Sequence, residues 1–452
     1  MEHSGLWSLV PTFIVLIVAL ATHRTFEALL CGALLGYVIV DPSDFFSAFV
    51  DSLLNVMQDP TIGWIILVCG LFGSLIHLLV ASGGATAFAN SLLGFVKTRR
   101  SALIVTWLLG LVLFIDDYLN ALTIGSSMKP VTDKFRVSRE MLAYIVDSTA
   151  APVCVLVPLS TWAIYVAGLL ESNGLAETGQ GLEAYVKAIP FAIYGWIAAL
   201  TVPLVAWGVI PPLGAMRRAE LRAAEGELAP PNSEAITLDI PQTSSEQTPR
   251  LAYFALPIVV LIGATVYFEI DALKGVLVAT AFTVAMYVGL RLMTFASALD
   301  SVFAGFKTML YALAIIVMSF VLKAVNDELG LTLFVIETVS PWLSRALLPA
   351  VVFVTLSGIT FSTGSFWGVY AVSLPIVIPL AQSLEVHPWL AIGAVVSSGA
   401  FGSHACFYGD ASVLSASAAG CNNMAHVLTQ LPYALLAAAI STVIFVALGY
   451  VY

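Results

Sequence analysis

Long apolar runs recur along the whole chain and are separated by short polar segments. Crossing a bilayer takes about 20 apolar residues in a helix. Eight runs approach that length, at residues 6–21, 26–40, 62–81, 189–210, 251–268, 275–290, 308–321 and 431–450. No basic segment precedes the first run and no small-residue cleavage site follows it, so we interpret it as a span and not a signal peptide. The pattern predicts an all-α integral membrane protein.

Two shorter apolar stretches flank a pair of adjacent carboxylates, Asp116 and Asp117. Residues 101–115 and 118–128 are too short to cross about 30 Å at about 1.5 Å per residue. We therefore expect a re-entrant hairpin with the two aspartates at its tip. The next apolar pattern, residues 141–170, is interrupted by polar residues and a proline at 147–152. This interruption predicts one broken membrane helix.

The second half of the chain repeats this plan at an offset of about 245 residues. The matching positions are 84–88 with 330–334, Phe114 with Phe361, 142–143 with 390–391, and 190–192 with 432–434. We accordingly expect a second hairpin from 346–361 and 366–381, and a second broken span from 389–396, 397–410 and 411–419.

Five crossings and one hairpin per half would place the second half upside down relative to the first, as in the inverted repeats of secondary transporters. We expect a first repeat at 1–212, a cytoplasmic linker at 213–250 and a second repeat at 251–452. With the N-terminus outside, all Lys and Arg residues fall on the inner side except Lys187, Lys274, Lys323 and Arg345. This asymmetry agrees with the positive-inside rule and supports the orientation.

Composition excludes several other classes of protein. Hydrophobic residues make up 60% of the chain, charged residues only 10%, and the net charge is −10. The balance predicts a multi-pass protein of a bacterial-type inner membrane, in contact with lipid. The absence of a basic run argues against a nucleic-acid partner. The five cysteines have no metal-ligand spacing, and we expect neither a disulfide framework nor a cofactor.

The polar groups inside the apolar runs are the candidate site. Charged side chains are costly in a membrane and indicate function there. In the first half, the candidate cation ligands are Asp116, Asp117, Asn120, Asp147, Ser148 and Thr149. Sodium prefers such oxygen ligands, and carboxylates shielded from water can take up a proton instead. In the second half, we expect an opposite wall formed by Ser362, Thr363, Ser365, Ser403, His404 and Asp410.

Each of these residues also has an ordinary interpretation. Asp116, Asp117 and Asp147 could cap helices, and the first two could do so in water. Asp410, near the end of the second broken span, could face cytoplasmic water. His404 could be a hydrogen-bonded core histidine that carries no proton.

Several segments of the first half resemble the NhaC-type sodium/proton antiporter family. They are Phe-Ile-Asp-Asp-Tyr at 114–118, Lys-Pro-Val-Thr-Asp-Lys at 129–134, Ser-Arg at 138–139 and the stretch 142–153. The resemblance implies a non-enzymatic member of the wider ion-transporter superfamily, with inverted repeats, hairpins, a homodimer and elevator-type alternating access. It implies Na⁺ and H⁺ as the transported ions. The family also includes malate/lactate and amino-acid carriers.

The second half departs from the family pattern. Ser403 stands where the resemblance leads us to expect Asp, and 405–412 replace a Ser-Pro-x-Ser-Asp-Thr-Thr run; only Gly402, His404 and Asp410 match. The alternative is therefore a sodium- or proton-coupled transporter of a small organic solute, such as a dicarboxylate, hydroxy acid or amino acid. An intramembrane aspartyl protease is disfavoured, because 406–410 lack the first glycine of a Gly-x-Gly-Asp motif. A passive channel is disfavoured because inverted halves suit alternating access better than a pore.

Overall fold

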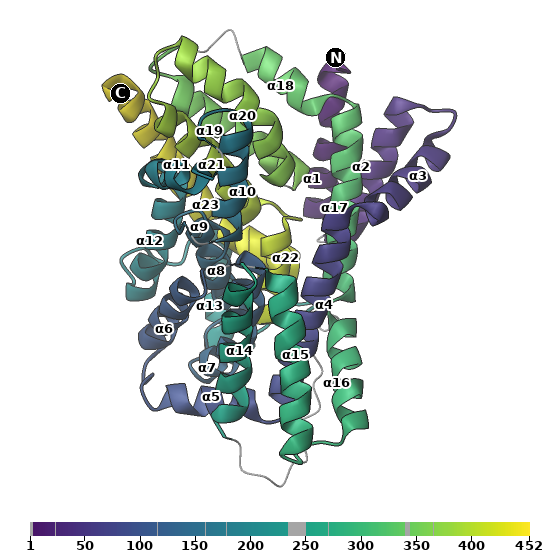
Figure 1. Cartoon of the computed structure of the whole chain (residues 1–452), viewed down its shortest axis with the longest axis vertical. Coiled ribbons are helices and arrows are strands. Elements are labelled where there is room, and N and C mark those ends of the chain that lie inside the picture. Colours follow the sequence, from purple (N-terminus) through teal and green to yellow (C-terminus); the bar gives the residue numbers. More distant parts are fainter. Residues whose placement is uncertain are drawn as a thin grey trace.

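The computed structural model describes residues 3–22, 24–114, 116–158, 160–177, 179–233, 250–269, 271–339, 344–364 and 366–452. Within these ranges the regular structure is helical and contains no strand, which confirms the predicted all-α class. The two chain termini lie at the same end of the molecule (Figure 1). An even number of membrane crossings would produce this arrangement.

Eight helices, four from each half of the chain, pack into one body that we call the scaffold group; in Figure 1, α14 lies near the centre of the view and the others lie to its right. They are α1 (Val10–Thr22), α2 (Thr25–Val40), α3 (Phe45–Gln58), α4 (Pro60–Ala81), α14 (Ala252–Tyr267), α15 (Ala272–Gly289), α16 (Phe295–Thr308) and α17 (Leu310–Glu328). Helix α4 packs on α15 and α16, and α17 packs on α2 and α3. A Cβ on Gly305 would overlap the backbone of Gly73, so glycine allows α16 and α4 this close approach.

The remaining long helices form a second body, the core group. They are α6 (Arg99–Val112), α7 (Asp117–Lys134), α8 (Arg139–Thr149), α9 (Ala151–Cys154), α10 (Thr161–Ser172), α11 (Gly181–Ala188), α12 (Ile193–Trp207), α19 (Leu348–Thr363), α20 (Phe366–Ser383), α21 (Pro388–Ala405), α22 (Asp410–Ala419) and α23 (Asn423–Val451). Helix α21 packs on α12, α19, α20 and α23, and its residues from Leu390 to Ala405 are all buried. Both halves of the chain therefore surround the same central helix.

The chain passes between the two groups through three connections. Helix α5 (Gly84–Leu93) joins α4 to α6, and α18 (Leu331–Val339) joins α17 to α19 at the corresponding place in the second half. Each is preceded by a glycine with left-handed backbone, Gly83 at φ 75° and Gly330 at φ 70°. Glycine adopts this backbone conformation without steric cost. The third connection contains α13 (Gly214–Ala224).

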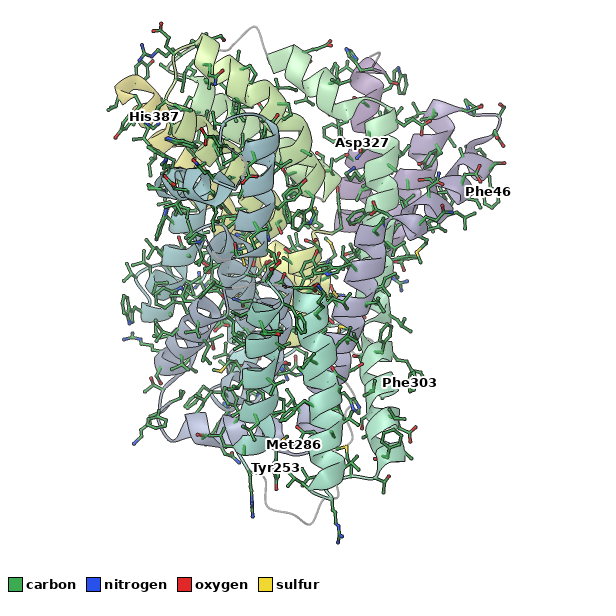
Figure 2. The ribbon with its side chains drawn as sticks, in the orientation of Figure 1. Phe46, Tyr253, Met286, Phe303, Asp327 and His387 are labelled. Atoms are coloured by element: carbon green, nitrogen blue, oxygen red, sulfur yellow. The ribbon has the colours of Figure 1, made fainter. Side chains whose placement is uncertain are left out.

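The outer surface of the helices is apolar. Phe46 on α3 and Phe303 on α16 are 64% and 65% exposed and project from the outside of the scaffold group (Figure 2). Large exposed apolar side chains are expected where a helix contacts lipid. In the part of the chain that the structure describes, six helical stretches are long and apolar enough to cross a membrane, at Ile62–Ala81, Ala272–Gly289, Phe295–Glu328, Phe366–Ser383, Pro388–Ala419 and Asn423–Val451. The bent pair Gly181–Phe191 and Ile193–Trp207 would add a seventh.

All eight predicted spans coincide with helices, but some of these helices are shorter than a full crossing. The apolar helices Thr25–Val40 and Ala252–Tyr267 fall below the usual spanning length, as does Gly5–Val15, where the 3₁₀ turn Gly5–Leu9 leads into α1. Helices α6 with α7 and α19 with α20 occupy the positions of the expected hairpin arms, but α7 and α20 are each 18 residues long, and Phe366–Ser383 is long and apolar enough to cross a membrane. Helix α7 continues to Lys134, beyond the predicted end at residue 128.

Both helix breaks are narrower than predicted. Helix α8 continues through Thr149, and the chain bends at Ala150 and leaves helical structure again after α9. Helix α21 continues through Ala405, so that only residues 406–409 interrupt it before α22. In the last turn of α8, the Thr149 hydroxyl lies 3.0 Å from both the Ile145 and the Val146 carbonyl oxygens of its own helix.

The segment predicted as a linker contains an ordered helix. Helix α13 buries Met216, Ala219, Glu220 and Ala223, which share one face at helical spacing. The Arg222 guanidinium donates to the buried Glu140 carboxylate at the start of α8, at 2.7 and 2.8 Å, and Glu220 pairs with Arg99 of α6. The predicted linker is therefore packed against the core group at its first part. Residues 234–249 lie outside the described residues.

Candidate functional site

Asp147 lies in the last turn of α8 and is completely buried. Its Oδ2 atom accepts hydrogen bonds from Gln430 Nε2 at 2.6 Å and from Ser412 Oγ at 2.8 Å. The same oxygen lies 3.1 Å from His426 Nε2. These three partners come from α22 and α23, in the second half of the chain. The other oxygen, Oδ1, has no hydrogen-bond partner among the described residues. Asp147 therefore retains one free carboxylate oxygen, which a cation or proton would satisfy.

His404, at the end of α21, connects three helices through its ring. Its Nδ1 atom lies 2.7 Å from the Tyr194 hydroxyl on α12, and its Nε2 atom lies 2.9 Å from the Ser148 hydroxyl on α8. The Gln430 amide also donates to the His404 carbonyl. Ser148 and His404, expected in opposite walls of the site, are thus in direct contact. The ring has the two partners of a hydrogen-bonded core histidine, beside a carboxylate.

Asp116 and Asp117 begin α7, and each is only 2% exposed. Asp116 caps the helix, because its Oδ1 accepts the backbone N–H of Tyr118 at 3.0 Å and of Leu119 at 2.9 Å. Its Oδ2 accepts the Thr161 hydroxyl at 3.2 Å. The buried Trp162 indole is the side-chain hydrogen-bonding neighbour of the Asp117 carboxylate, although neither Asp117 Oδ2 nor Trp162 Nε1 forms a bond of good geometry among the described residues. Capping is therefore right for Asp116, and both aspartates are almost fully buried.

Asp410 is the first residue of α22 and is 5% exposed, so the water-facing interpretation is wrong. The Tyr118 hydroxyl donates to its Oδ2 atom, and the Ala411 N–H donates to Oδ1 at 2.8 Å. Tyr118 directly follows Asp117 in the chain. This bond connects the aspartate pair of the first half to the second broken helix.

The Asn120 side chain on α7 connects α6 to the end of α8 through hydrogen bonds. Its Nδ2 atom donates to the Gly110 carbonyl on α6 at 2.7 Å and to the Thr149 carbonyl on α8 at 2.9 Å. Its Oδ1 atom is buried and has no hydrogen-bond partner among the described residues. Asn120 thus offers one free oxygen, whereas the Thr149 hydroxyl is occupied within α8.

The second-half hydroxyls differ in their availability. Ser362 Oγ donates to the Gly358 carbonyl at 2.7 Å, and Thr363 Oγ1 donates to the Thr360 carbonyl at 3.4 Å, both within α19. Ser403 Oγ is buried and has no partner in the described part of the chain, while its carbonyl accepts Ser412 Oγ at 3.0 Å. Ser365 lies outside the described residues. Among the expected second-half hydroxyls that the structure describes, that of Ser403 therefore remains free for a ligand.

In both halves, a cysteine thiol at the helix break donates a hydrogen bond to a phenylalanine carbonyl at the expected hairpin tip. Cys154 Sγ donates to the Phe114 carbonyl at 3.2 Å, and Cys406 Sγ donates to the Phe361 carbonyl at 3.1 Å. Phe114 and Phe361 are the positions matched in the sequence. Helix α9, which ends at Cys154, and helix α22, which begins at Asp410 just after Cys406, lie about half-way between the two ends of the molecule (Figure 1).

A cavity of about 670 Å³ lies between the two helix groups, in contact with the aspartate pair. Scaffold residues line one side of it and core residues the other; its full lining is Asp59, Pro60, Trp64, Ile65, Asp116, Asp117, Tyr118, Thr161, Tyr165, Phe320, Lys323, Trp367 and Gly368. Aromatic rings thus form much of the wall. The volume lies within the range of small-molecule sites and far exceeds the need of a bare ion.

Sequence reasoning missed several residues of this site, including Ser412, Tyr118 and Tyr194. It also missed His426 and Gln430, because they precede the apolar run that was assigned as the last span. The available signal was their spacing, since residues i and i+4 share one face of a helix. Trp64, Lys323 and Trp367 gave no signal, because their proximity to the aspartates depends on how the groups pack.

Comparison with known proteins gives a family. The profile described as the Na⁺/H⁺ antiporter family matches residues 175–450. A protein of Haemophilus influenzae strain Rd, described only as an uncharacterized protein, is 31% identical over 488 residues, which cover 99% of this chain and 92% of the relative. The profile match includes the second-half residues of the site, whereas the NhaC-like segments at 114–153 lie before it.

Proposed function

Because the chain belongs to the Na⁺/H⁺ antiporter family, we propose that it exchanges Na⁺ for H⁺ through an intramembrane site built on Asp147 and Asp117. The observation that carries this proposal is the burial and hydrogen bonding of the Asp147 carboxylate. It is fully buried, three side chains of the opposite half approach one of its oxygens, and the other oxygen has no partner among the described residues.

The free oxygens near Asp147 provide the chemistry that a sodium ion requires. Asn120 Oδ1, Ser403 Oγ and Gln430 Oε1 are buried without hydrogen-bond partners in the described residues, and each belongs to a residue bonded to Asp147 or to its neighbours. Neutral oxygens and one carboxylate suit a hard monovalent cation. A buried carboxylate without a counter-charge is costly, so release of Na⁺ favours uptake of H⁺ at the same oxygen. Exchange follows from this competition.

The aspartate pair of α7 forms the cavity side of the site. Asp117 lines the 670 Å³ cavity and its Oδ2 forms no hydrogen bond of good geometry among the described residues, while Asp116 is committed to the cap of α7 and to Thr161. In our proposal, Asp117 receives the cation from the cavity, and Asp116 adds negative charge next to it. Tyr118 and Asp410 continue the polar contacts toward the second broken helix.

We further propose that the two halves are inverted repeats and that the core group moves against the scaffold group as an elevator. The same order of helices in both halves, the paired thiol contacts at Phe114 and Phe361, and the cavity between the groups support this proposal. The resemblance to the wider superfamily extends it to a homodimer in a bacterial-type inner membrane.

A second candidate function is coupled transport of a small organic solute. The cavity favours it, because 670 Å³ with Trp64, Tyr165 and Trp367 in its walls is suited to an organic molecule. Ionic and organic transport use the same aspartates in this arrangement, so the solute would occupy the aromatic part and the ion the carboxylates.

Reconstitution in proteoliposomes tests both functions. A Na⁺ gradient alone is expected to change the internal pH, read with an enclosed pH-sensitive dye. Asp147→Asn and Asp117→Asn should abolish this change while the purified proteins elute as wild type. Asp300→Asn, at an exposed position of α16, is the matched control and should exchange normally. Exchange that appears only after dicarboxylates, hydroxy acids or amino acids are added would select the second function, and wild-type exchange in Asp147→Asn would refute the site.

A further inference from the structure

Lys323 stands where two cavities of the protein meet. The main cavity contains Asp116 and Asp117, and a side cavity of about 480 Å³ lies next to it. Asp59, Phe320 and Lys323 line both. Every other charged residue in the two linings is acidic; these are Asp51, Asp59, Asp116, Asp117, Asp327 and Glu328. Among the described residues, Lys323 is thus the basic residue of the two cavity linings, in which the other charged side chains are carboxylates.

The lysine is held at this junction from two sides. Its Nζ atom lies 2.7 Å from Asp327 Oδ2, one turn later on α17. Asp327 lies toward the end of the molecule that carries both termini (Figure 2). On the other side, a Cβ at Gly368 would come within 2.7 Å of Lys323 Cε and 3.3 Å of Nζ. Glycine at 368 therefore leaves the space that the end of the lysine side chain occupies.

The two residues that position Lys323 belong to different groups. Lys323 and Asp327 are on α17 of the scaffold group, whereas Gly368, Asp116 and Asp117 belong to α20 and α7 of the core group. A displacement of the core group would carry the aspartates away from the lysine. The repulsion between Lys323 and a cation at the aspartates consequently depends on the position of the core group.

We propose that Lys323 is a fixed positive charge that weakens cation binding at Asp117 and thereby speeds release of the cation into the side cavity. The inference rests on the proposed exchange function and assigns a positioning role to a residue that does not itself bind the ion. Phe320 and Trp367 also line the main cavity, and apolar walls strengthen electrostatic interactions. The acidic side cavity then receives the released cation.

The test is Na⁺-dependent proton exchange by four variants in proteoliposomes. Lys323→Gln should lower the half-saturating Na⁺ concentration about tenfold, since a like charge across a cavity of this size contributes on that order. It should also reduce the maximal rate, because release is slower. Lys323→Arg should restore wild-type values. Gly368→Ala should act in the same direction as Lys323→Gln, since the added Cβ displaces the lysine.

Lys187→Gln is the matched control, because Lys187 forms the same kind of i,i+4 pair with Glu183 but lines neither cavity. It should leave both kinetic constants unchanged. An unchanged half-saturating Na⁺ concentration in Lys323→Gln, with an active wild type, would overturn the inference. Complete loss of exchange in a correctly eluting Lys323→Gln protein would also overturn it, since the lysine would then be part of the binding site. Inactive wild-type protein would instead refute the proposed function.

Discussion

The side-chain amide of Gln430 donates a 2.6 Å hydrogen bond to Asp147, so that a carboxylate of the first half is held by a helix of the second. Both residues are completely buried. The same amide contacts the His404 carbonyl at the end of α21. Two amide contacts therefore fix the carboxylate relative to the second helix break, and the site depends on both halves at once.

This relationship predicts that Gln430→Ala lowers Na⁺-dependent proton exchange about tenfold or more. A hydrogen bond to a charged group contributes about 1.5–3 kcal/mol, and its loss frees Asp147 to move. The initial rate of dye response at a fixed Na⁺ gradient measures the effect. Gln382→Ala, at an exposed position of α20, should behave as wild type. Equal rates for Gln430→Ala and Gln382→Ala would show that Asp147 does not need the amide.

The Asp116 carboxylate caps α7 and, in the proposed function, also adds negative charge next to Asp117. Substitutions can separate these two roles. Asp116→Asn keeps an oxygen that can accept the Tyr118 and Leu119 N–H groups, whereas Asp116→Ala removes it. We expect Asp116→Ala to lower the free energy of unfolding by about 0.5–2 kcal/mol relative to Asp116→Asn. Thermal unfolding of the detergent-purified variants measures the difference. Identical unfolding temperatures in the two variants would mean that the cap contributes nothing to stability.

The ion pair of Glu140 and Arg222 joins α13 to α8 in a buried setting. Glu140 is 1% exposed and accepts both hydrogen bonds from one guanidinium nitrogen. Arg222→Gln leaves that carboxylate without its counter-charge, and breaking a buried pair in this way costs about 3–5 kcal/mol. We expect a large drop in the thermal unfolding temperature.

The exposed pair of Lys274 and Asp271 is the control for this measurement. Surface pairs contribute up to about 1 kcal/mol, so Lys274→Gln should change the unfolding temperature little. An Arg222→Gln protein as stable as Lys274→Gln would show that α13 is not anchored by the pair.

Glycine and threonine face each other between hairpin and broken helix in both halves. A Cβ on Gly110 of α6 would overlap Thr149 of α8, and a Cβ on Gly402 of α21 would overlap Thr360 of α19. Gly110→Ala and Gly402→Ala should each destabilise the protein by about 1–3 kcal/mol through overpacking. Denaturation of the purified variants provides the measurement.

Gly358→Ala supplies the opposite expectation, because a Cβ at that position of α19 meets no atom within 4 Å. Alanine at an unobstructed helix position stabilises by about 0.5–1 kcal/mol relative to glycine. Destabilisation of all three variants to the same extent would contradict the argument from close packing.

The sequence was sufficient to predict the helices and the approximate place of each helix break. Apolar runs and their lengths determine these features, because the bilayer imposes them. The assembly of the site was less accessible. Nothing in the sequence around Gln430 shows that α23 brings its amide to Asp147, and nothing near Lys323 shows that α17 faces α7. Such contacts between distant segments depend on how small residues pack, and many different sequences allow the same packing.

The role of hydroxyls was the least predictable part. Ser148, Thr149, Ser362 and Ser403 all looked like ligands, yet Thr149 and Ser362 donate within their own helices. A serine or threonine in a helix can always donate to a carbonyl one turn before it. Whether its hydroxyl does so depends on the partners that neighbouring helices offer, as His404 does for Ser148.

The three connections between the helix groups have a mechanical consequence. The Arg222–Glu140 pair links α13 to α8, so in the proposed elevator movement α13 would move together with the helices that carry the aspartates. α5 and α18 instead begin at left-handed glycines, Gly83 and Gly330. Any movement of one helix group past the other would therefore rotate α5 and α18 about these two glycines.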